Sequence, residues 1–343
     1  MRFMPLIPGS KALWLALLVG LTTSAQALDF PGPEPGKAKG SLVQGQSLAL
    51  SNQALALSWS TFGGRLQPTT FRDLLGGHLL EAPLEAFTLE FQDGTRLKAS
   101  RMQATAFQVE ALVGDPKSVG EAGRLPGQRV SATLNAPNGT LRVHWQATLR
   151  DGSNYIRQEL QLTALKGDVD LARVRLIDHW LKGAESTGRV AGSPVVADTI
   201  FTGLEHPMVR TQLEAGGVPK LIPAPGTEDG PLAPDRPESR ETREPEPRWG
   251  RTHVQSWLDL ALPLREGRSL QLSSVLGVVP PGQLRRGFLF YLERERAHAY
   301  RPFLHYNSWY DLGYFTPYRD QDCLGVIEVL GRELVQHPQN FFN

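Results

Sequence analysis

The sequence predicts a mainly β protein, in which a large antiparallel β-sandwich is followed by one β–α unit. First, residues 141–149 alternate strictly between apolar and polar side chains, which is the pattern of a half-buried strand. Second, pairs of Asn or Asp with Gly recur between apolar segments. Third, apolar residues recur at helical spacing near the end of the chain, after a long region without such a pattern.

Tight turns are predicted where an Asx-Gly pair separates two segments of strand pattern. These pairs are Asp93-Gly94, Asn138-Gly139 and Asp151-Gly152. Both residue types tolerate the positive φ that a two-residue hairpin turn requires, so each pair predicts an antiparallel hairpin. Further strands are expected at Val254–Leu264, Ser269–Val279 and Gly287–Leu292. Together these elements predict one β-sandwich domain over residues 41–297.

Two segments of the chain differ from this pattern. Residues 28–40 form a lead that is rich in Pro and Gly. Residues 223–249 have almost no apolar side chains, so burial there cannot offset the entropy of ordering the chain. We therefore expect residues 223–249 to be a mobile surface insertion inside the β domain.

Residues 298–343 predict a different element order. Pro302–Tyr306 has the pattern of a buried strand, and Thr316 is a suitable N-cap with Pro317 at the first helical position. The apolar face of the predicted helix consists of Cys323, Ile327, Leu330 and Leu334. This segment therefore predicts one β–α unit, the unit from which barrels and doubly wound sheets are built. If this face had no barrel neighbours it would favour association, so an oligomer is possible on sequence grounds.

The first 27 residues predict a cleavable signal peptide. Arg2 and Lys11 supply a positive start, residues 12–21 are apolar, and Ala25-Gln26-Ala27 has the small-x-small pattern of a cleavage site. A membrane anchor is the alternative, but a spanning helix needs roughly 20 apolar residues. We expect a periplasmic or secreted protein cut after Ala27, with no membrane span.

Composition excludes several classes of function. The 36 basic and 35 acidic side chains balance, so a nucleic-acid partner is not expected. One cysteine excludes an intrachain disulfide and a cysteine-rich metal site, and the scattered histidines predict no metal site or cofactor. Asp178-His179 and Glu205-His206 could be acid/base or ligand pairs, but neighbours on a strand point to opposite faces. Structural hydrogen bonds are the favoured interpretation of both pairs.

The segment His305–Tyr314 combines aromatic side chains with Asn and Asp. Aromatic faces cover the apolar patches of a sugar ring, while amide and carboxylate groups bind its hydroxyl groups. The same aromatic side chains could instead pack between domains. Composition leaves both interpretations open.

Asn307-Ser308-Trp309, placed after an apolar strand and before a helix, resembles the opening of the catalytic barrel in clan D glycoside hydrolases. These are the α-galactosidase (melibiase) families 27 and 36. Stretches similar to the N-terminal β-supersandwich of family 36 lie upstream, at residues 151–158, 192–196, 201–207 and 282–288. The resemblance implies that residues 298–343 begin an incomplete (β/α)8 barrel and that a terminal galactoside or similar sugar is the partner. It implies that Trp309 lines the sugar pocket, with Asn307, Tyr310 and Asp311 as neighbours on the same rim.

One departure from the family is large. Its members are retaining enzymes, which need two carboxylates about 5–5.5 Å apart. The family supplies them from later barrel strands, and nothing in this sequence matches either one, so no catalytic residue is assigned. The resemblance therefore implies a truncated chain that is inactive alone. A non-catalytic carbohydrate-binding or interaction module is the alternative function, and a non-functional remnant is a third possibility.

Overall fold

The computed structural model describes residues 28–81, 85–215, 250–298, 306–309, 311–313 and 315–336. The predicted signal peptide and the predicted insertion at 223–249 lie outside the described residues, as does most of the predicted strand Pro302–Tyr306. The chain divides into two compact units, Met1–Ala299 and Tyr300–Asn343. We call them the sandwich unit and the C-terminal unit.

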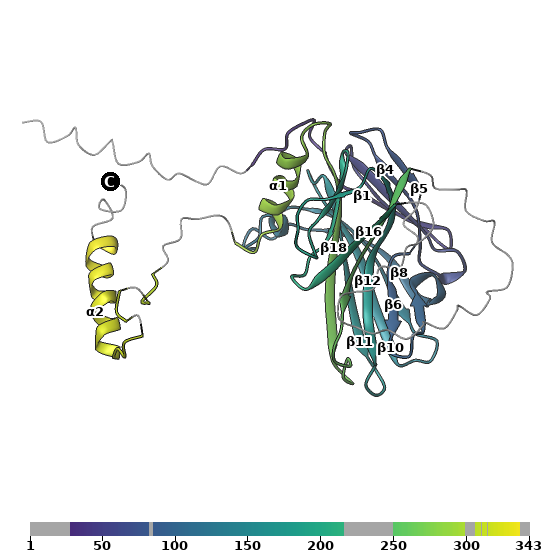
Figure 1. Ribbon diagram of the computed structural model, residues 1–343. Helices are drawn as coiled ribbons and strands as arrows, with labels where there is room; N and C mark the ends of the chain where they lie inside the picture. The colour runs from purple at the N-terminus through teal and green to yellow at the C-terminus, as the bar shows by residue number, and fades with distance from the viewer. Residues whose placement is uncertain are drawn as a thin grey trace, which may run out of the picture. The chain divides into compact units, whose positions relative to one another are not determined.

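The sandwich unit contains three antiparallel sheets (Figure 1). The eight-stranded sheet has the order β13-β14-β15-β18-β11-β10-β9-β8, and the two five-stranded sheets have the orders β1-β2-β3-β4-β5 and β16-β17-β12-β6-β7. The strands of the eight-stranded sheet are β8 (Gln103–Leu112), β9 (Gly127–Asn135), β10 (Leu141–Arg150), β11 (Tyr155–Ala164), β13 (Glu185–Ser186), β14 (Val195–Ala197), β15 (Ile200–Leu204) and β18 (Ser269–Val278). The first five-stranded sheet consists of β1 (Lys39–Val43), β2 (Ser47–Ser51), β3 (Leu55–Ser60), β4 (Gln67–Asp73) and β5 (Leu79–Glu81). The second consists of β6 (Thr88–Phe91), β7 (Arg96–Lys98), β12 (Leu171–Lys182), β16 (Val209–Ala215) and β17 (Arg251–Asp259).

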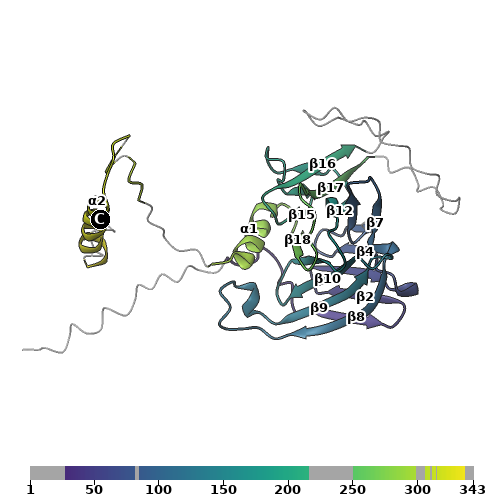
Figure 2. The same cartoon turned by 90° about the horizontal axis from the view of Figure 1, so that it is seen from below.

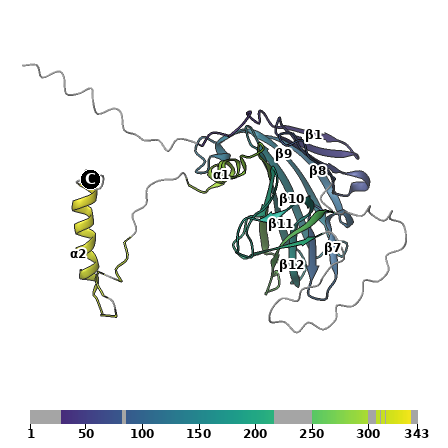
Figure 3. The same ribbon diagram turned by 45° about the horizontal axis from the view of Figure 1, so that its top comes forward.

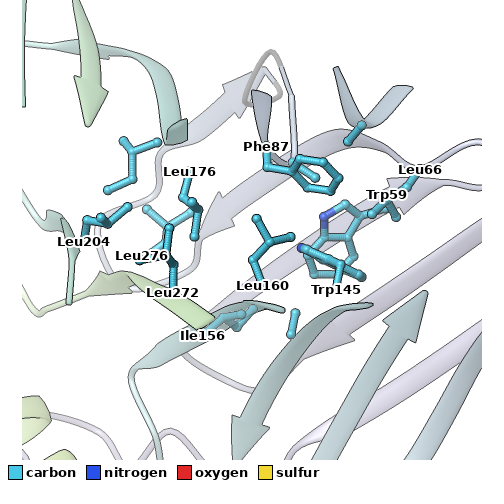
Figure 4. Packing of buried hydrophobic residues seen from close by; sticks show 14 of the residues in the cluster. Trp59, Leu66, Phe87, Trp145, Ile156, Leu160, Leu176, Leu204, Leu272 and Leu276 are labelled. Carbon is cyan, nitrogen blue, oxygen red and sulfur yellow. The ribbon is translucent and has the colours of Figure 1, made fainter. Parts of the chain in front are cut away.

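Both five-stranded sheets pack on one face of the eight-stranded sheet (Figure 2). On one side, the ring of Trp59 from β3 meets the ring of Trp145 from β10 edge-on, with centroids 5.0 Å apart. On the other side, Leu176 from β12 lies beside Leu272 and Leu276 from β18 (Figure 4). One buried apolar cluster includes residues from all three sheets. The mainly β, antiparallel sandwich predicted from the sequence is therefore confirmed.

The predicted hairpin turns are present. Gly94, Gly139 and Gly152 adopt φ values of 81°, 69° and 69°, the left-handed conformation that favours glycine. Along β10 the predicted alternation holds, because Trp145 and the other apolar residues at odd positions are buried. β17 ends at Asp259, short of the predicted end at Leu264, and Leu262 between them is exposed.

The predicted strand at Gly287–Leu292 is wrong, because this segment lies within helix α1 (Leu284–Glu295). Leu284, Phe288 and Tyr291 recur at helical spacing and pack against the outer face of the eight-stranded sheet (Figure 3). Phe288 and Tyr291 contact Phe201 of β15, with ring centroids 5.3 and 5.7 Å away. A short apolar run fits a strand or a helix, and here burial of one helical face against the sheet decides between them.

The C-terminal unit contains helix α2 (Asp320–Leu330), which continues as a π-helical turn over Gly331–Val335. Thr316 is not its N-cap, because the helix begins after Arg319. The N–H of Arg319, the N-cap residue, donates to the Asp322 carboxylate at 2.8 Å, so this backbone donor has a partner. No side chain of α2 is buried, and Ile327 on the predicted apolar face is 62% exposed. The described residues do not show a barrel unit.

No described helix is long and apolar enough to span a membrane.

Candidate functional site

Three of the four predicted sugar-contacting residues lie in one turn of the C-terminal unit, and Tyr310 lies outside the described residues. The Trp309 N–H donates to Asn307 Oδ1 at 3.0 Å, and the hydroxyl of Tyr306 donates to the Asp311 carboxylate at 2.6 Å. This hydrogen bond to Asp311 raises the pKa of Tyr306 to about 12. We call residues 306–309 and 311–313 the Trp309 turn.

Trp309 is 45% exposed. Its ring meets Phe315 edge-on, with centroids 5.5 Å apart, so Trp309 is partly supported from within its own unit. An accessible aromatic ring beside an amide and a carboxylate is chemically suited to the apolar and hydroxyl patches of a sugar. Among the described residues of this turn, Asp311 is the only one with a carboxylate.

A second polar site, which the sequence did not predict, lies on the outer face of the eight-stranded sheet beside α1. It consists of two adjacent hollows of about 250 and 420 Å³ that share Arg157 and Glu295. We call this pair of hollows the outer-face cleft. The smaller hollow also contains Arg129, Thr148, Arg150, Tyr155 and Glu159, and the larger contains Glu205, Ser273, Tyr291 and Arg296.

Arg157 of β11 organises the centre of the outer-face cleft. Its Nε lies 2.6 Å from the Glu205 carboxylate and its Nη1 lies 2.7 Å from that of Glu159. The Glu295 carboxylate lies 3.9 Å from the same Nε. Burial alone would lower the pKa of Arg157, but the surrounding carboxylates, Glu205 first, raise it overall. One guanidinium thus holds carboxylates from β11, from the segment after β15 and from α1.

Two tyrosines complete this arrangement. The hydroxyl of Tyr155 donates to Glu295 at 2.7 Å, and that of Tyr291 donates to Glu205 at 2.5 Å. The two rings pack edge-on with centroids 4.9 Å apart. Burial raises the pKa of Glu295, although its bonds to Tyr155 and Arg157 act in the opposite direction. The cleft therefore presents side chains whose positions are fixed before any ligand binds.

Neither Asp178-His179 nor Glu205-His206 acts as a unit in the structure. Asp178 bonds His253 at 2.5 Å, whereas His179 points into the core, where burial lowers its pKa to about 4. Glu205 joins the Arg157 cluster, while His206 accepts the N–H of Met208 at 3.2 Å. Within the described part of the chain, no group of three or more His, Cys, Asp or Glu side chains could hold a metal ion.

Sequence reasoning missed the outer-face cleft because its parts are far apart in the chain. Arg157 and Glu159 have the pattern of the ordinary polar face of a strand, and Glu295 lies just after the predicted strand Gly287–Leu292. Antiparallel register brings β9, β10, β11 and β18 side by side, and α1 supplies the remaining wall.

Comparisons with protein-family models and with curated proteins find no match. Solved structures do match. An α-galactosidase from Lactobacillus brevis aligns with 83% of this chain and 47% of its own, at 9% identity and a TM-score of 0.43. A GH36 α-galactosidase from Geobacillus stearothermophilus aligns with 71% of this chain and 41% of its own, at 12% identity and a TM-score of 0.39. The galactosidase domain of an α-galactosidase–sucrose kinase covers 71% and 42%, at 8% identity and a TM-score of 0.41. The chain spans less than half the length of these α-galactosidases.

Proposed function

We propose that this protein is an exported carbohydrate-active protein that binds a terminal galactosyl or similar residue of a glycan at the Trp309 turn. The observation that carries the proposal is the exposed indole of Trp309, set in one turn with Asn307 and Asp311. A ring face next to hydrogen-bonding amide and carboxylate groups is the combination that a pyranose needs.

We propose further that the chain does not hydrolyse glycosides on its own. Retaining hydrolysis needs a nucleophile and an acid/base carboxylate about 5–5.5 Å apart. Asp311 accepts a hydrogen bond from Tyr306, and the sequence has no counterpart of the family's carboxylate pair. Binding without bond cleavage is therefore the expected chemistry.

The test of sugar binding uses the chain without its predicted signal peptide, beginning at Leu28. A glycan panel should show binding to galactose-terminated glycans, and Trp309→Ala should weaken it by about tenfold or more, the loss expected when a main ring contact is removed. Phe62→Ala removes another exposed ring, 79% accessible, from the sandwich unit and should leave binding unchanged. Flat responses for the unmodified chain, or equal binding by Trp309→Ala, would contradict the proposal.

The proposed export and lack of hydrolysis have separate tests. In a bacterial host, the chain should be recovered from the periplasm or medium with Leu28 as its first residue. Aryl α-galactosides should not release nitrophenol in its presence. Release that a single carboxylate substitution abolishes would show that the chain is a hydrolase.

A second candidate function is a non-catalytic binding module that uses the β-sandwich itself. The outer-face cleft favours it, because fixed charged side chains surround two hollows there. Its test is ligand binding that survives Trp309→Ala.

A further inference from the structure

The smaller hollow of the outer-face cleft has a basic end. Arg129 on β9, Thr148 on β10 and Arg157 on β11 are direct cross-strand neighbours. Arg150 follows Thr148 by two residues, so it projects from the same face of the sheet. Three guanidinium groups and the hydroxyl of Thr148 therefore line the same hollow.

The charges at this end are unequally neutralised. Arg157 has three carboxylates within 4 Å, two of them closer than 3 Å. Arg150, in contrast, forms no ion pair among the described residues, and its Nη1 donates to the Leu125 carbonyl at 2.7 Å. Arg129 reaches Glu110 only at 3.5 Å, and that glutamate side chain is 62% exposed. Arg150 thus has no ion-pair partner among the described residues, and Arg129 has one long, partly exposed ion pair.

Two polar atoms at the same end are shielded from solvent without a hydrogen-bond partner in the described structure. They are Thr148 Oγ1 and Arg129 Nε. Buried polar atoms in proteins are nearly always hydrogen-bonded, so two such donors on one small hollow require an explanation. Small rotations of these two side chains would let both atoms donate to an oxyanion bound in the hollow.

Burial and the adjacent charge of Arg129 also lower the pKa of Arg150. The two cations therefore stand in an unfavourable electrostatic position that an anion would relieve.

The side of the hollow formed by β11 and α1 carries carboxylates as well as Arg157. Glu159 and Glu295 contribute carboxylate oxygens there, and Tyr155 donates its hydroxyl to Glu295. A ligand with charge on all sides, such as inorganic phosphate, would meet these carboxylates unfavourably. A ligand with one anionic end and hydroxyl donors at the other end matches both walls.

We propose that the smaller hollow binds a hydroxylated carboxylate, namely a hexuronic acid residue. Its carboxylate would lie between Arg129, Thr148 and Arg150, and its hydroxyl groups would face Glu159 and Glu295. The anionic end and the hydroxyl end of this ligand are inferred from the side chains that line the hollow in the sandwich unit. Only the choice of a sugar rests on the proposed function. The hollow of about 250 Å³ is slightly below the usual range of about 300–1,000 Å³ for ligand pockets, which suits a single small ring.

The test is calorimetric titration of the chain from Leu28 with D-galacturonate, D-galactose, lactate and sulfate. Galacturonate should bind at least about tenfold more tightly than galactose, because only the acid forms charge-assisted hydrogen bonds with arginine. It should also bind more tightly than lactate, which lacks the ring hydroxyls, and than sulfate, which lacks the hydroxyl end. Its affinity should fall as salt concentration rises.

Arg150→Gln should weaken galacturonate binding by about tenfold or more, with little effect on galactose. Arg142→Gln is the matched control, because Arg142 projects from the same face of the same strand at its other end and is exposed. Thermal unfolding checks that each variant is folded. If Arg150→Gln does not fold, Arg129→Gln takes its place as the test of galacturonate binding.

Equal binding of galactose and galacturonate would overturn the proposal, as would unchanged galacturonate binding by folded Arg150→Gln and Arg129→Gln. Equal binding of lactate or sulfate would overturn the assignment of a sugar acid. The Trp309→Ala variant separates the two proposals, because it should lose galactoside binding at the Trp309 turn and keep galacturonate binding at the cleft.

Discussion

The two faces of the eight-stranded sheet have very different environments, although the same strands form both. On the inner face, Trp145 and Leu160 are opposite one another and are almost completely buried against the five-stranded sheets. On the outer face, Arg157 and Glu159 occupy the alternate positions of β11, the strand of Leu160, and remain partly accessible. Helix α1 covers only part of this outer face.

This difference separates stability from binding within one sheet. The inner face gains its free energy from apolar burial, which is non-directional, and the indole N–H groups of Trp59 and Trp145 are buried there without a hydrogen-bond partner in the described structure. The outer face fixes charged groups in set positions, and half-buried ion pairs contribute little net stability after desolvation. Substitutions of buried residues on the inner face should therefore change unfolding, and substitutions of the charged residues on the outer face should change ligand binding and pH dependence.

The largest effect is expected for Trp145→Ala. The side chain is 1% exposed and packs against Trp59, so its removal leaves a cavity and should lower the free energy of unfolding by about 3–5 kcal/mol. Gln146→Ala, at the next position on β10, should cost less than about 1 kcal/mol because that side chain points to the outer face. Chemical denaturation measures both, and equal losses would contradict the separation of the faces.

The sequence was sufficient for the inner face and for the turns. Strict alternation along residues 141–149 predicted which side chains of β10 are buried, because period-two burial needs only local sequence. Asx-Gly pairs predicted the hairpins, because positive φ is a local requirement. Gly287–Leu292 could not be assigned in this way, because six apolar or small residues fit either period and the choice depends on the sheet against which they pack.

The candidate sites differ in the same respect. Asn307, Trp309 and Asp311 are close in sequence, so their grouping in one turn follows from the chain itself. The outer-face cleft combines Arg157 with Glu205 and Glu295, which lie in separate elements. Strand register and the position of α1 create that grouping, and neither can be predicted from the local pattern of a single sequence.

The second largest effect is expected at Gly277, which lies on the outer face opposite Phe201. A Cβ atom there would lie 2.2 Å from a ring carbon of Phe201, and the ring is fully buried, so Gly277→Ala should cost about 1–3 kcal/mol. Gly203→Ala on β15 is the control, because its nearest contact would be an ordinary 3.6 Å. A double-mutant cycle with Phe201→Leu should show strong coupling, and independent losses would mean that the two residues do not compete for the same space.

The third prediction concerns Glu295→Gln and the pH dependence of stability. Because the pKa of Glu295 is raised in the folded state, the wild type holds an extra proton on folding between the ordinary value near 4.5 and the raised value. Its free energy of unfolding should therefore fall relative to that of the variant as pH rises through this interval. Gln keeps an acceptor for Tyr155. Urea titrations from pH 4 to 8 measure the difference, with Glu293→Gln on the same helix as control. A wild-type free energy of unfolding that rises relative to that of the variant with rising pH would show that Glu295 is not desolvated.

The smallest effect on stability is expected for Thr148→Val. This substitution keeps the shape of the side chain and removes the shielded hydroxyl without a partner, so the free energy of unfolding should stay within about 0.5 kcal/mol of the wild type or rise slightly. If Thr148 helps to bind a carboxylate, galacturonate affinity should fall by about fivefold or more, because one hydrogen bond to a charged group is lost. Thr163→Val, on the outer face of β11 at the far end from Arg157, is the control and should leave that affinity unchanged. Weaker galacturonate binding without a loss of stability would show that the Thr148 hydroxyl serves ligand binding. Unchanged affinity in Thr148→Val would show that this hydroxyl does not contact the ligand.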